Sequence, residues 1–207
     1  MLDPRPVRAT PALHAQALVC ERGERALFAA LDLQLQAGDC VWLRGANGSG
    51  KTTLLRTLAG LRTVAQGELR WSAPRLYLGH ANALKDDLTV AECLRFAAAL
   101  QGQPCTNAAL QAALLPFDLV RLRGRLVRTL SQGQRRRSAL ARLALPQAAG
   151  CLWLLDEPFD ALDPDGVAAL VGLIERHTAG GGAVLFTSHQ TVPQVAARQL
   201  SLEAAGV

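Results

Sequence analysis

The order of apolar and polar residues along the chain predicts a series of strands. Residues 13–20 and 31–35 alternate loosely between apolar and polar positions, which indicates two early strands. Short strands are also expected at 67–71 and 76–78. Three continuous apolar runs are typical of parallel strands buried on both faces: 40–43, 152–155 and 183–187.

Helical spacing of apolar residues occupies much of the rest. A helix is predicted over 53–59, where Gly60 ends it, and another over 165–177 between two buried strands. Between Thr89 and Leu145 the spacing is helical, with alanine-rich segments at 90–101 and 107–115. The pattern therefore predicts an α/β fold with a helical insertion of roughly sixty residues. The first dozen residues are expected to form a loose extension.

Composition narrows the class of protein. At 207 residues with 50% hydrophobic and 19% charged residues, the chain suits one globular domain. It contains no apolar run of 18 residues, and the N-terminal residues lack the apolar core of a signal peptide, so we expect a cytoplasmic protein. The five cysteines form no C-x-x-C pair, which argues against a disulfide framework or a zinc site and favours reduced, mostly buried thiols.

Residues 45–52 read G-x-x-x-x-G-K-T and directly follow the predicted strand at 40–43. Glycines let the backbone wrap an anion, and N–H groups at the N-terminus of the following helix point at it. Lys51 adds a positive charge for the β- and γ-phosphates of a nucleoside triphosphate, and Thr52 offers a hydroxyl to Mg²⁺. The predicted loop residues are Gly45, Ala46, Asn47, Gly48, Ser49, Gly50, Lys51, Thr52 and Thr53.

Two adjacent carboxylates follow the buried strand at 152–155. Asp156 ends that strand, where it can hold Mg²⁺ opposite Thr52, and Glu157 comes next, where it can polarise an attacking water. The alternative interpretation is that two acids cap a turn before Pro158. The phosphate loop upstream favours the catalytic interpretation.

The net charge of +5 does not by itself identify a partner. The densest basic cluster is Arg135-Arg136-Arg137, which is compatible with a nucleic-acid patch or with a solvated helix face. The cluster directly follows the segment Leu130-Ser131-Gln132-Gly133-Gln134, which forms a motif of its own, and this position favours the solvated face.

Four further segments complete a pattern that resembles the ATP-binding subunits of ABC transporters. Leu130-Ser131-Gln132-Gly133-Gln134 resembles the ABC signature, and residues 152–158 resemble the Walker B motif. Ala161-Leu162-Asp163 resembles the D-loop, and His189 resembles the switch histidine. The resemblance covers nearly the whole chain. It implies a P-loop NTPase fold of the ABC type, with a mostly parallel core sheet, N-terminal antiparallel strands and a helical subdomain.

The same resemblance implies a division of the single domain, residues 1–207. The nucleotide-binding core would comprise about 1–79 and 146–207, and the helical subdomain about 80–145. Catalysis would fall to Glu157, His189 and Lys51, with ATP and Mg²⁺ as cofactors. Two chains would pair head to tail, so that signature residues of one meet the nucleotide of the other; these are Ser131, Gly133, Gln134 and, from the D-loop, Asp163.

Three positions depart from the family pattern, of which Gln132, in place of the usual signature glycine, is a mild change. His80 stands where the family usually has the Q-loop glutamine; it could bind a Mg²⁺-bound water or contact the γ-phosphate, or could be a structural loop histidine. Arg22 stands where the family often has an aromatic residue that stacks on adenine, and a guanidinium can stack as well.

The chain resembles the ATP-binding subunits that serve cytochrome c biogenesis in three features: its small size, the segment 77–80 and the segment 20–28. This implies a homodimer at the cytoplasmic face of the inner membrane, paired with a multi-span permease subunit. Haem would be handled only through the partners, and no nucleic acid is expected. The alternatives are an ATPase of an unrelated ABC importer or exporter and a soluble ABC protein that acts on ribosomes or DNA, which the short chain disfavours.

Overall fold

A parallel sheet forms the centre of the computed structural model, which describes residues 11–23, 25–191 and 195–202. Of the predicted N-terminal extension, residues 1–10 lie outside the described part of the chain. The sheet has the order β10-β5-β9-β8-β7, with every neighbouring pair parallel. Its strands are β5 (Cys40–Arg44), β7 (Arg75–Leu78), β8 (Leu152–Leu155), β9 (Ala183–Thr187) and β10 (Arg198–Ser201). The three predicted buried strands are confirmed, and β10 is an additional edge strand.

A second, antiparallel sheet has the order β4-β1-β6 and comprises β1 (Leu13–Val19), β4 (Leu31–Leu35) and β6 (Gln66–Trp71). The pairing of β1 shifts register on both sides near Ala17. Gly67 has φ +91°, and a Cβ there would lie 2.3 Å from the carbonyl oxygen of Ala17, so the close approach requires glycine. A short hairpin of β2 (Glu21–Arg22) and β3 (Arg25–Ala26) precedes β4.

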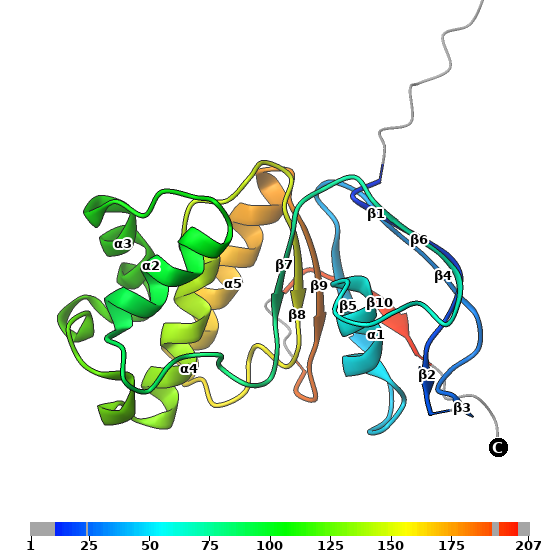
Figure 1. The fold of residues 1–207 in the computed structure, drawn as a ribbon, viewed down its shortest axis with the longest axis horizontal. Coiled ribbons are helices and arrows are strands. Elements are labelled where there is room, and N and C mark those ends of the chain that lie inside the picture. Colours follow the sequence, from blue (N-terminus) through cyan, green and yellow to red (C-terminus); the bar gives the residue numbers. More distant parts are fainter. Residues whose placement is uncertain (1–10, 24, 192–194, 203–207) are drawn as a thin grey trace, which may run out of the picture.

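The helices are α1 (Lys51–Leu58), α2 (Val90–Leu100), α3 (Asn107–Leu114), α4 (Gln132–Leu140) and α5 (Pro164–Ala179). Thr89 and Glu92 form a capping box at the start of α2, and Asp163 caps α5. The predicted helical stretch from 89 to 145 is helical but broken, because a loop at 101–106 separates α2 from α3 and short 3₁₀ turns separate α3 from α4. Figure 1 shows these three helices together at one end of the molecule and the antiparallel sheet at the other.

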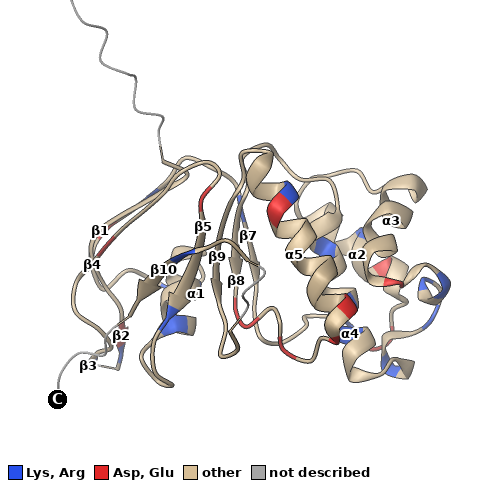
Figure 2. Ribbon diagram, turned by 180° about the vertical axis from the view of Figure 1, so that it is seen from behind, with Lys and Arg blue, Asp and Glu red and all other residues tan. Residues whose placement is uncertain are grey.

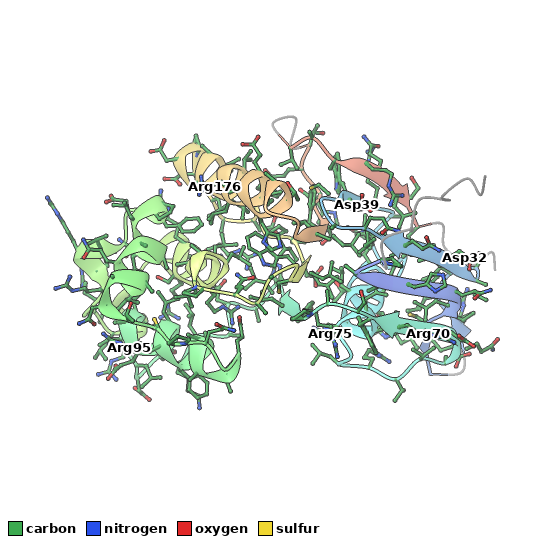
Figure 3. All side chains as sticks on the ribbon, turned by 90° about the horizontal axis from the view of Figure 1, so that it is seen from above. Asp32, Asp39, Arg70, Arg75, Arg95 and Arg176 are labelled. Atoms are coloured by element: carbon green, nitrogen blue, oxygen red, sulfur yellow. The ribbon has the colours of Figure 1, made fainter. Side chains whose placement is uncertain are left out.

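We call α2, α3, α4 and the 3₁₀ turns among them the helical lobe, and the two larger sheets with α1 the strand lobe. Seen from above, the helical lobe that carries Arg95 lies at one end and the strand lobe that carries Asp32 and Arg70 at the other (Figure 3). Alternate residues of the central strands face opposite sides: Trp153 and Leu155 pack toward α5 and the helical lobe, whereas Leu152 and Leu154 pack toward α1. The sheet is therefore buried on both faces.

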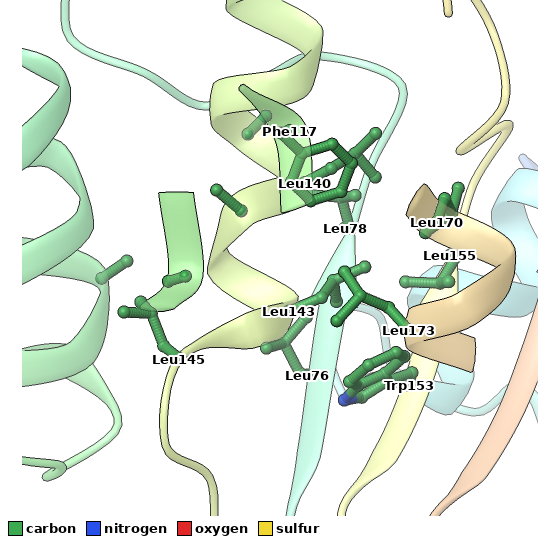
Figure 4. Close-up of a cluster of buried hydrophobic side chains, with 14 of the residues drawn as sticks. Leu76, Leu78, Phe117, Leu140, Leu143, Leu145, Trp153, Leu155, Leu170 and Leu173 are labelled. Carbon is green, nitrogen blue, oxygen red and sulfur yellow. The ribbon is translucent and has the colours of Figure 1, made fainter. Parts of the chain in front are cut away.

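The larger core joins the central sheet to the helical lobe. Figure 4 shows side chains of β7, β8, α4 and α5 meeting in this cluster, among them Leu78, Leu140, Leu155 and Leu170. All four are fully buried. Burial of a leucine side chain stabilises a fold by about 1.5–3 kcal/mol, so this cluster fixes α4 and α5 against the ends of the central strands.

The five cysteines are free thiols; Cys20, Cys93 and Cys151 are buried, and Cys40 and Cys105 are half-buried. Burial raises the pKa of Cys151 to about 11, and burial together with the charge of Asp39 does the same for Cys40. The prediction of mostly buried thiols is confirmed, and the protonated form of these two thiols is unreactive at neutral pH.

His177, near the end of α5, is a structural residue of the core. Its ring stacks on Trp153 with ring centroids 3.7 Å apart, and its Nε2 lies 2.8 Å from the carbonyl oxygen of Cys151. Burial lowers the pKa of His177. The folded protein therefore holds this imidazole neutral against the sheet.

We expect this burial to make stability depend on pH. The pKa of His177 in the folded state is below its unfolded value of about 6.5. The contribution of His177 to the free energy of unfolding is therefore fully present above that pH and falls as the pH drops through and below it. His177→Phe keeps a ring against Trp153 and should flatten this dependence. Urea unfolding of the wild type and the variant between about pH 7.5 and about pH 5.5 measures this dependence. If the free energy of unfolding falls equally with pH in the two proteins, the prediction is contradicted.

Candidate functional site

The glycine-rich loop connects the end of β5 to the start of α1, as the sequence predicts. Gly48 and Gly50 have φ of +81° and +99°, in the left-handed region that glycine adopts most readily. A Cβ on Gly50 would also lie 3.1 Å from side-chain atoms of Leu27 and Phe28. The loop therefore needs glycine at these positions to place its backbone N–H groups at the N-terminus of α1.

Lys51 is the first residue of α1 and is 9% exposed. Its Nζ donates to the carbonyl oxygens of Gly45 at 2.8 Å and Ala46 at 3.0 Å. These contacts hold the ammonium group over the loop, next to the N–H groups that would bind an anion.

A pocket of about 400 Å³ opens over this loop. It brings together residues that are far apart in the sequence: Arg22, Leu27, Asn47, Gly48, Gly50, Lys51, Thr52, Thr53, His80, Asp156, Glu157, Asp160 and His189. Most of the predicted nucleotide and catalytic residues thus share one cavity. The remaining loop residues Gly45, Ala46 and Ser49 lie in the same turn, where Ser49 is buried and its hydroxyl has no hydrogen-bond partner in the described part of the chain.

Asp156 follows β8 and is 2% exposed. Its Oδ1 accepts hydrogen bonds from the hydroxyls of Thr52 at 3.1 Å and Thr187 at 3.0 Å. Its Oδ2 is buried without a partner in the described residues. A buried carboxylate oxygen without a donor is costly, and a cation beside it would remove the cost.

The donor set fits Mg²⁺ better than a metal held by protein alone. Within the described residues no group of three or more His, Cys, Asp or Glu side chains is placed to hold a metal ion. Mg²⁺ in nucleotide sites takes one or two protein oxygens and completes its shell with phosphates and water. The hydroxyl of Thr52 and the free Oδ2 of Asp156 would supply these protein oxygens.

Glu157 is 7% exposed and has φ +50°, which is uncommon for a residue with a side chain. Its N–H donates to the Thr187 hydroxyl at 2.8 Å. Its carboxylate accepts the backbone N–H of His189 at 2.9 Å and lies 3.4 Å from the His189 Nε2. Thr187, at the end of β9, therefore fixes the backbone of Glu157, and His189, two residues later, orients its carboxylate at the pocket wall.

His80 and Arg22 line the pocket at its rim. The His80 side chain is 74% exposed, and its Nδ1 lies 3.7 Å from Oδ2 of Asp160. Arg22 belongs to the β2–β3 hairpin. Both residues are placed where they can reach a nucleotide, and their roles there stay predictions.

Ser131, Gly133, Gln134 and Asp163 are outside this pocket. Ser131 caps α4, accepting the backbone N–H of Gln134 at 3.2 Å, while the Gln134 side chain accepts the N–H of Ser131 at 3.1 Å. Asp163 caps α5 and pairs with Arg137. The signature residues thus form a second, separate helix N-terminus rather than a wall of the same pocket.

The arginine cluster is not the solvated helix face that the sequence favoured. Arg135 pairs with Asp86 at 3.1 Å and Arg137 pairs with Asp163, but Arg136 is 3% exposed. The interpretation as a solvated face is therefore wrong for Arg136, because the helix turns this residue toward the loop at 79–82. Other basic segments lie along loops at the helical end of the molecule (Figure 2).

Four residues at or beside the site had no predicted role: Leu27, Asp160, Thr187 and Arg136. Leu27 and Asp160 line the pocket, and Thr187 contacts both Asp156 and Glu157. Thr187 could have been found from the sequence, since it ends a predicted parallel strand next to the one that ends before Asp156. The contacts of Arg136 depend on packing between the lobes and had no local signal.

Comparison with known proteins gives a consistent result. The sequence model of the family described as ABC transporter matches residues 28–160, more than half of the chain. The cytochrome c biogenesis ATP-binding export protein CcmA of Albidiferax ferrireducens is 44% identical over 198 residues, covering 90% of this chain and 93% of that protein. The protein of the same name from Pseudomonas aeruginosa is 45% identical, covering 86% and 93%.

Solved structures agree on the fold. An ABC transporter ATP-binding protein from Pyrococcus furiosus superposes with a TM-score of 0.79 at 23% identity, covering 92% of this chain and 96% of that one. The ATP-binding subunit of another ABC transporter gives 0.77 at 24% identity, covering 86% and 79%. The expected ABC-type α/β fold is confirmed.

Within the described residues, no helix has both the length and the apolar character needed to cross a membrane. The phosphate loop, the paired carboxylates and the separate signature helix occur together with a family match and high identity over most of the chain. The chain belongs to the ABC transporter family of ATP-binding proteins and, within it, to the family of CcmA, the cytochrome c biogenesis ATP-binding export proteins.

Proposed function

We propose that this chain is the ATP-hydrolysing subunit of a membrane ABC complex that powers haem export, or release of a haem-loaded chaperone, in cytochrome c biogenesis. The observation that carries the ATPase part is the pocket that joins the phosphate loop to Asp156, Glu157 and His189. Identity of 44–45% to proteins named for cytochrome c biogenesis supports the pathway.

The residues divide the chemistry among them. Lys51 and the loop N–H groups hold the β- and γ-phosphates, and Arg22 packs against the base. Thr52 and Asp156, with His80 near the rim, would hold Mg²⁺ or its water, which when bound neutralises charge on the phosphates. Glu157 positions the attacking water and accepts its proton, while His189 keeps the Glu157 carboxylate in place and donates toward the γ-phosphate.

The signature helix supports a dimer as the working unit. ABC ATPases of membrane transporters act as pairs, and here the N-terminus of α4, capped by Ser131, lies outside its own pocket. In a head-to-tail homodimer the hydroxyl of Ser131, the backbone of Gly133 and Gln134, and Asp163 of one chain would face the γ-phosphate held by the other. Binding of ATP then closes the pair, and hydrolysis lets it open.

The partner and the location follow from the same proposal. A transporter ATPase requires membrane subunits, and we propose a multi-span permease of the cytochrome c maturation type, held at the cytoplasmic face of the inner membrane. Haem contacts those partners and not this chain. We propose that the subdomain at about 80–145, which contains the helical lobe, grips the permease, and the place of that lobe at one end of the molecule supports this role (Figure 1).

Affinity capture tests the pathway. A tagged Glu157→Gln chain, captured from ATP-treated and detergent-solubilised membranes, should hold its partners in the closed state, and mass spectrometry should identify cytochrome c maturation membrane subunits. Capture without ATP is the control. Recovery of an unrelated permease would refute the pathway and leave the ATPase, whereas ribosomal proteins alone would refute the transporter.

His80→Gln gives a narrower test. An amide can make the same polar contacts at the pocket rim as the exposed imidazole, so we expect ATPase activity of the assembled complex to stay within about tenfold of the wild type. Steady-state ATPase assays measure this. A loss as large as that of Lys51→Ala would show that the imidazole itself is required.

A further inference from the structure

Arg136 joins three segments that belong to different parts of the site. It lies in the middle of α4, and its Nη1 donates to the carbonyl oxygens of Gly79 and His80, both at 3.4 Å, and to Oδ1 of Asn82 at 3.2 Å. Its Nη2 donates to the carbonyl oxygen of Glu157 at 2.5 Å. One buried guanidinium therefore connects the signature helix to the His80 loop (residues 79–82) and to the residue proposed as general base.

Packing alone does not account for this side chain. Its hydrogen-bond partners are neutral oxygens, and its Nε has no partner in the described residues. The carboxylates of Asp160, Asp156 and Glu157 act on its charge without forming a direct ion pair with it. Burial of a charge without a carboxylate partner destabilises a fold, whereas a methionine of similar length would fill the space without that cost. The guanidinium is explained by the groups that it holds together.

Glu157 needs such restraint because its backbone is left-handed, with φ +50°. This conformation costs a non-glycine residue on the order of 1–3 kcal/mol and persists only where neighbours fix it. Its N–H is fixed by Thr187, its carboxylate by His189 and its carbonyl by Arg136. Of these three residues, Arg136 is the one contributed by the helical lobe.

We propose that Arg136 is a positioning residue that couples the two ATP sites of the dimer. It stands five residues after Ser131, about 7.5 Å along the same rigid helix, at 1.5 Å per residue. In the proposed head-to-tail homodimer, on which this inference rests, Ser131 faces the nucleotide of the partner chain. Nucleotide bound in the pocket of the partner chain therefore fixes α4 of this chain. Arg136 on α4 in turn fixes Glu157 in this chain's own pocket.

The coupling is tested in the assembled membrane complex by the dependence of ATPase rate on ATP concentration. The wild type should show a Hill coefficient above one, as two coupled sites allow. Arg136→Met should lower kcat about 10- to 100-fold through displacement of Glu157 and bring the Hill coefficient to one. Its affinity for a fluorescent ATP analogue should stay within about threefold of the wild type, because Arg136 does not line the nucleotide pocket.

Two further variants separate positioning from folding. A lysine at position 136 in Arg136→Lys can bond either the His80 loop or Glu157, so this variant should recover part of the kcat that Arg136→Met loses. If Arg136→Met aggregates, Arg136→Lys replaces it in every assay. Arg135→Met removes the pair with Asp86 and a long bond of 3.4 Å to the carbonyl oxygen of Leu130, but no contact to Glu157 or to the His80 loop, and it should match the wild type.

Three results would overturn the coupling: a wild-type Hill coefficient of one, unchanged kcat and cooperativity in Arg136→Met, or equal loss of nucleotide affinity and thermal stability in both Arg136 variants. A wild-type complex that does not hydrolyse ATP would instead refute the proposed function, and the coupling with it. An active wild type with unaltered Arg136 variants refutes the coupling alone.

Discussion

Glu157→Gln should reduce ATP hydrolysis by about 10² to 10⁴ while the protein continues to bind ATP, because loss of a positioned general base removes that much rate. Glutamine keeps the length and shape of the side chain and an oxygen that can accept the His189 N–H. It cannot take a proton from water. Thr187 fixes the Glu157 backbone, His189 orients the carboxylate, and the residue is 7% exposed, so bulk water cannot easily replace it as a base.

The measurement is steady-state ATPase activity of the membrane complex together with equilibrium binding of ATP to the same preparation. Glu175→Gln is the matched control, since Glu175 is an exposed acid on α5. We expect that control to hydrolyse ATP like the wild type. If Glu157→Gln keeps more than about a third of wild-type activity, the general base is another group.

The central sheet and the nucleotide loop could be predicted from the sequence because their signals are local. The runs at 152–155 and 183–187 are apolar on both faces, and the structure buries every residue of β8 and β9. The loop at 45–52 has the glycines that its positive φ angles require. Asp156 and Glu157 could be placed because they follow a strand that had to end at the same edge of the sheet.

Elements without an apolar pattern were not predictable. Strand β10, Arg198–Ser201, has mostly polar residues and forms only because β5 offers an open edge beside it. The hairpin of β2 and β3 is equally polar, yet it brings Arg22 to the pocket. These elements are fixed by tertiary contacts, so their sequences carry little information about them.

The buried arginine shows the same limit at the level of one side chain. Arg135, Arg136 and Arg137 are chemically identical neighbours, and α4 has no clear apolar stripe that would show which of them points inward. Only the packing of the helical lobe against the loop at 79–82 decides it. The positions of Asp160 and His80, which meet across the pocket rim, also depend on that packing.

Lys51→Ala should weaken ATP binding about 10- to 100-fold and abolish turnover at cellular nucleotide concentrations. Lys51 is 9% exposed, so its charge acts on the phosphates with little screening by water, and each hydrogen bond from an ionised donor contributes about 1.5–3 kcal/mol. Calorimetric titration with ATP measures the loss. Lys85, the other lysine of the chain, is exposed, and Lys85→Ala should bind ATP normally. Equal affinities in the two variants would show that Lys51 does not contact the phosphates.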